Sequence, residues 1–209
     1  MKVVLINGSP KAEGNTYLAC KTAAEALQGE GIDTEIIQIG HRAIAGCMAC
    51  NGCRKGEGCV HGDAEFLAWA EALYAADGVI FATPVYFAGL NGSVKAFLDR
   101  VFFSGRNRWR HKVGAGIAVV RRLGGMTAFQ QLNAYFLISE MLIAPTFYWN
   151  VAYGAAPGEV LQDGEGISLI QNLARNMAWM LKMKEQTKDS LPPPAPVPMQ
   201  ERVRTNFIR

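Results

Sequence analysis

Short apolar runs alternate with amphipathic segments along this chain. The apolar runs predict strands, because strands covered on both faces of a sheet are short and nearly continuous in apolar character. They lie at residues 3–6, 34–39, 77–83, 114–120 and 142–151. The segments between them have helical spacing and predict helices at residues 15–27, 64–76, 91–103, from 125 onward, and 166–183. Five strands with interleaved helices predict an α/β fold with a doubly wound parallel sheet.

Two segments depart from this alternation. Residues 40–62 are rich in Gly and Cys and are much longer than an ordinary connection, and loops of this length usually carry function. Residues 191–198 are mostly Pro and predict an extended polyproline II segment. We therefore expect one domain over residues 1–186, with the cysteine-rich loop at 40–62, and a Pro-rich tail over residues 187–209.

Composition fits one compact domain and excludes several classes of partner. The chain has 209 residues, a net charge of +3, 50% hydrophobic residues and 22 Gly. The basic stretch at 106–112 is best interpreted as a solvated loop, although contact with an anionic substrate stays open, and we expect no nucleic-acid partner. The first residues reach Gly8 too soon for a signal peptide, and no later apolar run has membrane-spanning length. We expect a cytoplasmic protein with no membrane partner.

Polar and Gly residues follow the first predicted strand. In a doubly wound sheet of strand order 2-1-3-4-5, ligands bind beyond the carboxyl ends of the first and third strands. This loop offers hydroxyl, amide and cationic donors at a helix N-terminus, which favours an anion. Its candidate binding residues are Ser9, Lys11, Gly14, Asn15 and Thr16. The loop lacks the Gly patterns for ATP and for dinucleotides, so it predicts a monophosphate site, with an ordinary polar turn as the alternative.

The loop after the third predicted strand contains aromatic residues. Its candidate residues are Pro84, Val85, Tyr86 and Phe87. Backbone amides and aromatic faces at this place suit a flat ligand such as the isoalloxazine of a flavin. Taken alone, these aromatic residues would more often be core residues. Their position opposite the predicted phosphate loop favours the functional interpretation.

Four cysteines stand close together in the long loop. They are Cys47, Cys50, Cys53 and Cys59, and three of them follow at steps of three. Such a run can wrap thiolates around one small metal centre, so an iron-sulfur cluster is the first interpretation. Thiols without metal and a tetrahedral zinc site are the alternatives, and disulfides are disfavoured in a reducing compartment. Cys20 lies in a predicted helix and is expected to be a buried apolar residue.

Residues 8–16, 83–87 and 95–100 resemble the NADPH-dependent FMN reductase family of flavodoxin-like proteins. The cysteine spacing, C-x2-C-x2-C-x5-C, resembles the iron-sulfur flavoprotein branch, in which such a run holds a 4Fe-4S cluster close to FMN. The chain departs from that branch after the fourth cysteine. Relatives commonly carry an acidic pair there, whereas this chain has His61, Gly62 and Asp63.

The resemblance implies a flavodoxin-like sandwich around a five-stranded parallel sheet of order 2-1-3-4-5. It implies that Ser9, Lys11, Asn15 and Thr16 hold the FMN phosphate, and that residues 84–87 contact the isoalloxazine and the ribityl chain. It places Gly124 and Gly125 at the far edge of the ring, and Arg121 and Arg122 are candidates for the region of flavin N1. It also implies that the four cysteines are the metal ligands and that the protein forms a homodimer or homotetramer.

These features lead to three hypotheses. The first is an FMN-dependent oxidoreductase that exchanges electrons with a small-molecule or protein partner and uses a 4Fe-4S cluster as a one-electron port. The second is a cluster-free FMN or quinone reductase with NAD(P)H as co-substrate. The third is a non-catalytic flavin- or zinc-binding module that senses redox state. No pattern of catalytic side chains is visible, so we expect the chemistry to rest on the cofactor.

Overall fold

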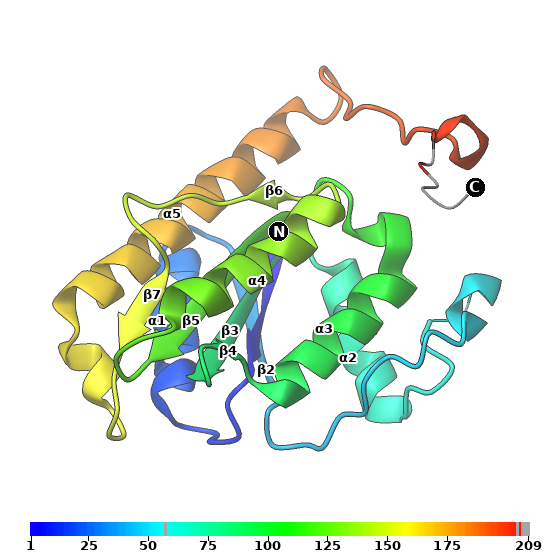
Figure 1. Ribbon diagram of the computed structural model, residues 1–209. Coiled ribbons are helices and arrows are strands. Elements are labelled where there is room, and N and C mark those ends of the chain that lie inside the picture. Colours follow the sequence, from blue (N-terminus) through cyan, green and yellow to red (C-terminus); the bar gives the residue numbers. More distant parts are fainter. Residues whose placement is uncertain (57, 204, 206–209) are drawn as a thin grey trace.

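A parallel sheet forms the middle layer of the molecule, and helices cover both of its faces (Figure 1). The computed structural model describes residues 1–56, 58–203 and 205. The sheet follows the order β2-β1-β3-β5-β6, and all neighbours on this path pair in parallel. Its strands are β1 (Lys2–Asn7), β2 (Asp33–Gln38), β3 (Gly78–Tyr86), β4 (Gly89–Leu90), β5 (Val113–Val120), β6 (Leu142–Ile143) and β7 (Val151–Tyr153). The predicted α/β fold with a doubly wound parallel sheet is confirmed.

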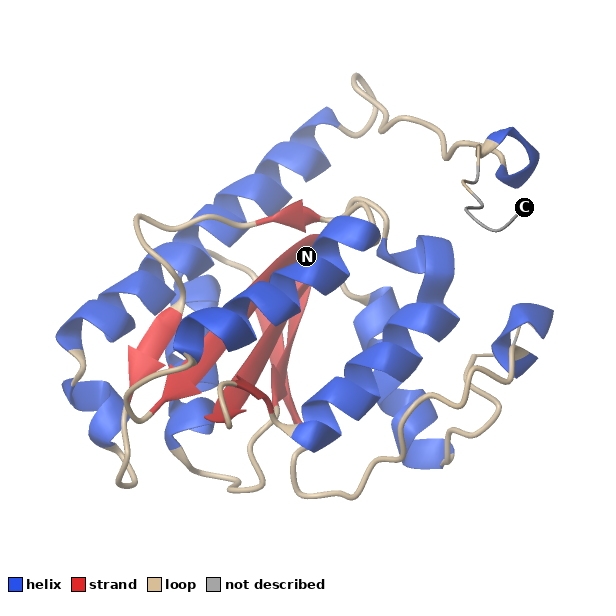
Figure 2. Ribbon diagram, viewed as in Figure 1, coloured by secondary structure: helices blue, strands red, loops and turns tan. Residues whose placement is uncertain are grey.

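Alternate residues of the central strands face opposite layers. Val3 and Leu5 point into the core beneath two helices, α1 and α5, whereas Val4 and Ile6 point into the core beneath the other three. The five α-helices are α1 (Asn15–Gly29), α2 (Ala64–Ala75), α3 (Gly92–Gly105), α4 (Gly125–Ile138) and α5 (Gly164–Thr187). Figure 2 shows the helices on the two sides of the strands. Both faces of the sheet are thus buried, as the apolar strands predict.

Caps and short 3-10 helices complete the described elements. Asp63 caps α2, because its carboxylate accepts a hydrogen bond from Phe66 N at 2.8 Å. Asn91 caps α3 in the same way, through Ser93 N at 2.8 Å. The 3-10 helices are η1 (Gly52–Lys55), η2 (Arg106–Trp109), η3 (Glu159–Gln162) and η4 (Met199–Glu201).

The predicted count of five strands is wrong, since the sheet has seven. The run predicted as one strand at 142–151 is two short strands, β6 and β7, which pair with opposite ends of β5. Pro145 comes two residues after the end of β6 and has no N–H to donate, so the ladder is interrupted there. In addition, β3 continues past residue 83 to Tyr86, because Val85 and Tyr86 pair with β4 in an antiparallel hairpin.

The chain leaves the body after α5, and its Pro-rich segment has no helix or strand until η4. Arg110 ties this segment to the body by donating hydrogen bonds to the carbonyl oxygen of Pro194, at 3.3 and 3.4 Å. Residues 204 and 206–209 of the predicted tail lie outside the described residues. No helix among the described residues has both the length and the apolar character to cross a membrane.

Candidate functional site

The two predicted ligand loops meet at the carboxyl end of the sheet. Asn7, the last residue of β1, pairs with Ala82 of β3. Immediately beyond this pair, Gly8 N donates to Ala82 O at 2.9 Å. A side chain at Gly8 would overlap Val94 of α3, so the loop after β1 lies tight against both neighbours. The fold therefore brings the loop after β1 and the end of β3 to one edge, the lower edge in Figure 1.

Hydrogen bonds within the first loop hold its backbone in place. Asn7 Oδ1 accepts from Ser9 N at 3.1 Å, and Ser9 Oγ accepts from Lys11 N at 3.1 Å. Gln38, at the end of β2, donates to the carbonyl oxygens of Ser9 and Pro10 at 3.2 and 3.4 Å. These hydrogen bonds restrain the backbone conformation of the loop.

The N-terminus of α1 has no side-chain cap. Gly14 occupies the cap position and has no side chain that could accept from the first-turn N–H groups. Lys11 is exposed beside this helix end and Thr16 is buried behind it. A pocket of about 200 Å³ opens here, with Glu13 also on its wall. Free N–H groups next to a Lys at the positive end of the helix dipole are features that favour an anion.

Asn15 makes contacts that sequence analysis did not anticipate. Its Oδ1 accepts from Gly158 N at 2.9 Å and from Val160 N at 3.4 Å, and its Nδ2 donates to Ala156 O at 2.9 Å. The side chain thus ties the loop after β7 to the predicted phosphate loop, and Ala155 and Pro157 of that loop line the same pocket. Sequence analysis did not predict that Ala155 and Pro157 form part of this pocket. The only signal was a cluster of Gly and Pro at 154–158, just after a predicted strand.

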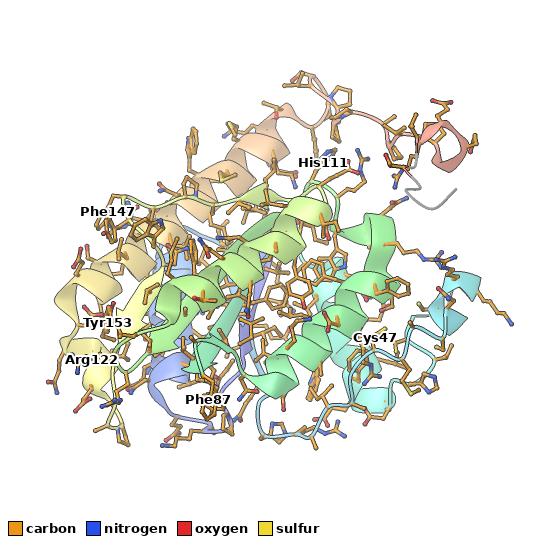
Figure 3. The ribbon with its side chains drawn as sticks, viewed as in Figure 1. Cys47, Phe87, His111, Arg122, Phe147 and Tyr153 are labelled. Carbon is orange, nitrogen blue, oxygen red and sulfur yellow. The ribbon has the colours of Figure 1, made fainter. Side chains whose placement is uncertain are left out.

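The hairpin after β3 turns on two residues with positive φ. Phe87 and Ala88 have φ values of 48° and 58° and connect β3 to β4, as a two-residue hairpin requires. Phe87 is fully exposed, and Figure 3 shows it at the lower edge of the molecule between Arg122 and Cys47. Pro84 and Val85 are half-buried beneath it. The turn therefore presents an aromatic ring to solvent at the edge where the ligand loops meet.

Gly124 packs against this hairpin. It has a φ of +90°, and a Cβ on it would lie 2.6 Å from Ala88 Cα and 3.3 Å from a methyl carbon of Val85. A Cβ on Gly125 would lie 2.5 Å from a methyl carbon of Val151. The structure thus brings Gly124 to the predicted aromatic loop and places Gly125 on the far side, against β7. Arg121 and Arg122 precede them as exposed residues.

Phe87→Gly is expected to raise the free energy of unfolding by roughly 1 kcal/mol, because Gly adopts positive φ without steric cost. Thermal melting should rise by about 2–4 °C. Phe87→Ala is the matched control, since it removes the same ring and keeps the strained backbone. Equal melting temperatures for the two variants would show that the backbone at Phe87 is not strained.

The four cysteines of the long loop line one pocket. Cys53 is buried, Cys59 is half-buried, and Cys47 and Cys50 are exposed. All are free thiols, and Arg100 of α3 contributes to the same wall. Among the described residues, no three ligand side chains stand close enough together to hold a metal ion as they are. The thiols line one pocket, but among the described residues they do not converge on a point. Figure 3 labels Cys47, one of the four.

Ion pairs fix the base of the cysteine loop. Arg42 pairs with Asp63 at 2.7 Å and with Glu65 at 2.5 Å, both at the start of α2. The carbonyl oxygen of Arg42 also accepts from Ser93 Oγ at 2.8 Å. Hydrogen bonds from Arg42, and then from the backbone N–H of Phe66, hold the pKa of Asp63 below its ordinary value. The loop is therefore anchored to α2 and α3 at the end where it leaves β2.

Two other sequence features lie away from this edge. The basic stretch at 106–112 precedes β5 at the amino end of the sheet, and its Arg108 and Arg110 pair with Glu71 and Glu140 at 2.7 Å. Cys20 is fully buried in α1, and burial raises the pKa of its thiol to about 12. Neither feature lines the pocket beside α1 or the pocket of the four cysteines.

Comparison with known families decides the classification of the chain. The sequence profile of the family described as NADPH-dependent FMN reductase matches residues 1–156. The chain belongs to this family. It is therefore an FMN-dependent oxidoreductase, and the third hypothesis, a non-catalytic module, is disfavoured.

Individual relatives of this reductase agree in sequence and in fold. An iron-sulfur flavoprotein of Methanocaldococcus jannaschii is 35% identical over 88% of this chain and 98% of its own length. Among solved structures, RosB with bound 8-demethyl-8-formylriboflavin-5'-phosphate matches with a TM-score of 0.71 and 16% identity, over 100% of this chain and 92% of that chain. A flavodoxin from the domain Archaea matches with a TM-score of 0.59 and 11% identity, over 87% and 99%. The two structures show that the fold is flavodoxin-like.

Proposed function

We propose that this reductase binds FMN across the carboxyl ends of β1 and β3, takes electrons from NAD(P)H or a protein donor, and carries a 4Fe-4S cluster on the cysteine loop as a one-electron port. The observation that carries the proposal is the juxtaposition at one sheet edge. There the uncapped helix end, the exposed aromatic hairpin and the base of the cysteine loop all meet.

The residues present fit an FMN phosphate. The first-turn N–H groups of α1 have no side-chain cap, and Ser9, Lys11 and Thr16 stand beside them. In this proposal Asn15 acts by holding the loop after β7 against the phosphate site, since its amide already bonds that loop. Gly14 lets the backbone approach, while Val85, Tyr86, Phe87 and Gly124 border the ring. Bound FMN would accept an electron pair as hydride and release electrons singly.

The donor set of the cysteine pocket fits an iron-sulfur cluster. Four thiols and one buried guanidinium line the pocket, and one nitrogen of that guanidinium has no hydrogen-bond partner among the described residues. A cluster bound to thiolates carries one electron at a time. Loading requires the thiols to converge, and the loop has residues with positive φ at Ala49, Asn51 and Gly56, where its backbone direction changes. The M. jannaschii relative is named an iron-sulfur flavoprotein, which supports the proposal of an iron-sulfur cluster in this chain.

Lys11→Ala is expected to weaken FMN binding about tenfold, because it removes a cationic partner of the phosphate. Titration of the apoprotein with FMN, followed by flavin fluorescence, measures the dissociation constant. Lys21→Ala is the control, since Lys21 is an exposed residue of α1, the helix that follows the Lys11 loop, and pairs with Glu25. An unchanged dissociation constant for Lys11→Ala would remove Lys11 from the phosphate site.

Electron donors distinguish the proposal from the second hypothesis, the cluster-free NAD(P)H-dependent reductase. Rates of electron transfer are measured for iron-loaded and iron-depleted protein, each with FMN. The donors are NADPH, NADH and a reduced ferredoxin, which gives one electron. The proposal predicts that iron depletion slows exchange with the ferredoxin and leaves FMN bound. Fast turnover with NAD(P)H alone, equal with and without iron for all donors, would support the cluster-free reductase.

The aromatic segment beside β7 supports a homo-oligomer as part of this proposal. Phe147, Tyr148, Trp149 and Tyr153 are between 48% and 61% exposed and lie next to the outermost short strands of the sheet. Figure 3 shows Phe147 and Tyr153 on the same side of the molecule. Exposed aromatic residues of this kind are enriched at protein interfaces. Sedimentation velocity would test for a dimer or tetramer.

A further inference from the structure

Arg100 is buried in the cysteine pocket without a carboxylate partner. It is 7% exposed and is the one buried charged side chain among the described residues. Within that same part of the chain, Arg42, Arg108 and Arg110 each pair with a carboxylate, whereas Arg100 forms no ion pair. The pocket thus holds a cation whose counter-ion is missing from the protein's own carboxylates.

The contacts of the guanidinium fix its plane and leave one nitrogen unsatisfied. Its Nε donates to Cys59 Sγ at 3.4 Å, and its Nη1 donates to Ala45 O at 3.4 Å. Its Cζ lies 3.9 Å from the centre of the Phe66 ring. Its Nη2 is buried and has no hydrogen-bond partner among the described residues. A hydrogen bond already joins this cation to one of the four thiols, and further N–H groups remain for an anion.

Arg side chains are always charged in proteins, so Arg100 is a fixed cation in this pocket. Burial of such a charge is costly unless an anion compensates it. The positive charge of Arg100 contributes to the lowered pKa of Asp63, but the Asp63 carboxylate already forms an ion pair with Arg42 at 2.7 Å. The anions that the pocket offers are therefore the sulfurs themselves. Net charge and hydrogen bonds to sulfur are among the factors that set the potential of an iron-sulfur cluster.

We propose that Arg100 is the counter-cation of the cysteine pocket. Arg100 helps to hold the cluster in place through the Cys59 sulfur, and it raises the midpoint potential of the cluster. The inference rests on the proposed 4Fe-4S cluster. One-electron reduction adds one negative charge and transfers no proton, and Arg100 stabilises the more negative form. In the test below, the electron comes from dithionite. Arg100 acts here as a positioning and tuning residue and not as a ligand.

The test compares wild type, Arg100→Gln and Arg100→Lys after anaerobic cluster loading. Each is titrated with dithionite at fixed ambient potentials, and the reduced cluster is quantified by electron paramagnetic resonance. For Arg100→Gln we expect the ratio of reduced to oxidised cluster to fall about tenfold at a given potential, which is a shift of ~59 mV to more negative potential for one electron. Arg100→Lys should retain most of the wild-type potential, because it keeps the charge.

Arg108→Gln is the matched control. The guanidinium of Arg108 also lies over an aromatic ring, 4.2 Å from the centre of Tyr74, but it pairs with Glu71 at 2.7 Å. Its replacement should leave the potential unchanged. Melting temperatures of the apoproteins check that each variant folds.

The outcomes separate this inference from the proposed function. Equal potentials for wild type and Arg100→Gln, with cluster in both, would overturn the role of Arg100 and leave the cluster standing. Absence of iron in wild type would overturn the cluster and this inference together. If Arg100→Gln retains no iron, retention by Arg100→Lys supports the counter-cation, and loss of iron from both variants overturns it in favour of a packing role.

Discussion

Gly40→Ala is expected to weaken FMN binding by about 10- to 100-fold and to lower the melting temperature. Gly40 follows β2 and begins the cysteine loop, and it presses on the predicted phosphate loop. A Cβ there would lie 2.5 Å or less from backbone atoms of Gly8 and Ser9. Backbone atoms cannot rotate away as a side chain would, so the loop itself must move. Overpacking of this kind costs typically about 1–3 kcal/mol, and each 1.4 kcal/mol is about tenfold in affinity.

Gly46→Ala is the control for this variant. Gly46 lies in the same cysteine loop, but a Cβ on it would meet no atom within 4 Å. The dissociation constant of FMN and the melting temperature are measured for both variants. Similar FMN affinities for Gly40→Ala and Gly46→Ala would show that the phosphate does not bind in the loop that Gly40 supports.

Replacement of Cys50 and Cys53 together by serine is expected to abolish iron binding and to leave FMN binding within about twofold of wild type. Two of four thiolate ligands are then lost, and the remaining Cys47 and Cys59 cannot complete a cluster. FMN binding should persist because the phosphate loop is held by the side chains of Gln38, Asn7 and Ser9, and not by the cysteines. Iron and sulfide analysis and flavin absorption measure the two effects.

Cys20→Ala controls for the loss of a thiol as such. Cys20 is fully buried in α1, and its Sγ lies 3.7 Å from Ile6 O, so it belongs to the core and not to the pocket. This variant should retain wild-type iron. Iron retained by the double serine variant would mean that the metal is bound elsewhere in the chain.

The fold was largely predictable because its strands are apolar over their whole length. β1, β3 and β5 have both faces covered, so their sequence signal is strong and local. The strand predicted at 142–151 failed because the apolar residues of that run serve two short strands with Pro145 between them. The second strand of the β3–β4 hairpin has only two residues, Gly89 and Leu90, which carry no strand pattern of their own.

The candidate site was predictable only where a motif follows a strand. The loops after β1 and β3 were located in this way, since the carboxyl ends of neighbouring parallel strands meet. Arg100 could not be singled out, because on α3 it looks like any helical Arg, and its burial depends on described loop residues such as Cys53 and Cys59 that line the same pocket. The role of Asn15 likewise depends on Gly158, which is remote in sequence.

The composition of anaerobically purified protein tests the central claim most directly. FMN, iron, acid-labile sulfide and zinc are determined on the same sample, together with the absorption spectrum. The account predicts about one FMN with about four irons and four sulfides per chain. FMN with neither iron nor sulfide would contradict it and would leave the cluster-free NAD(P)H-dependent reductase as the function of this chain.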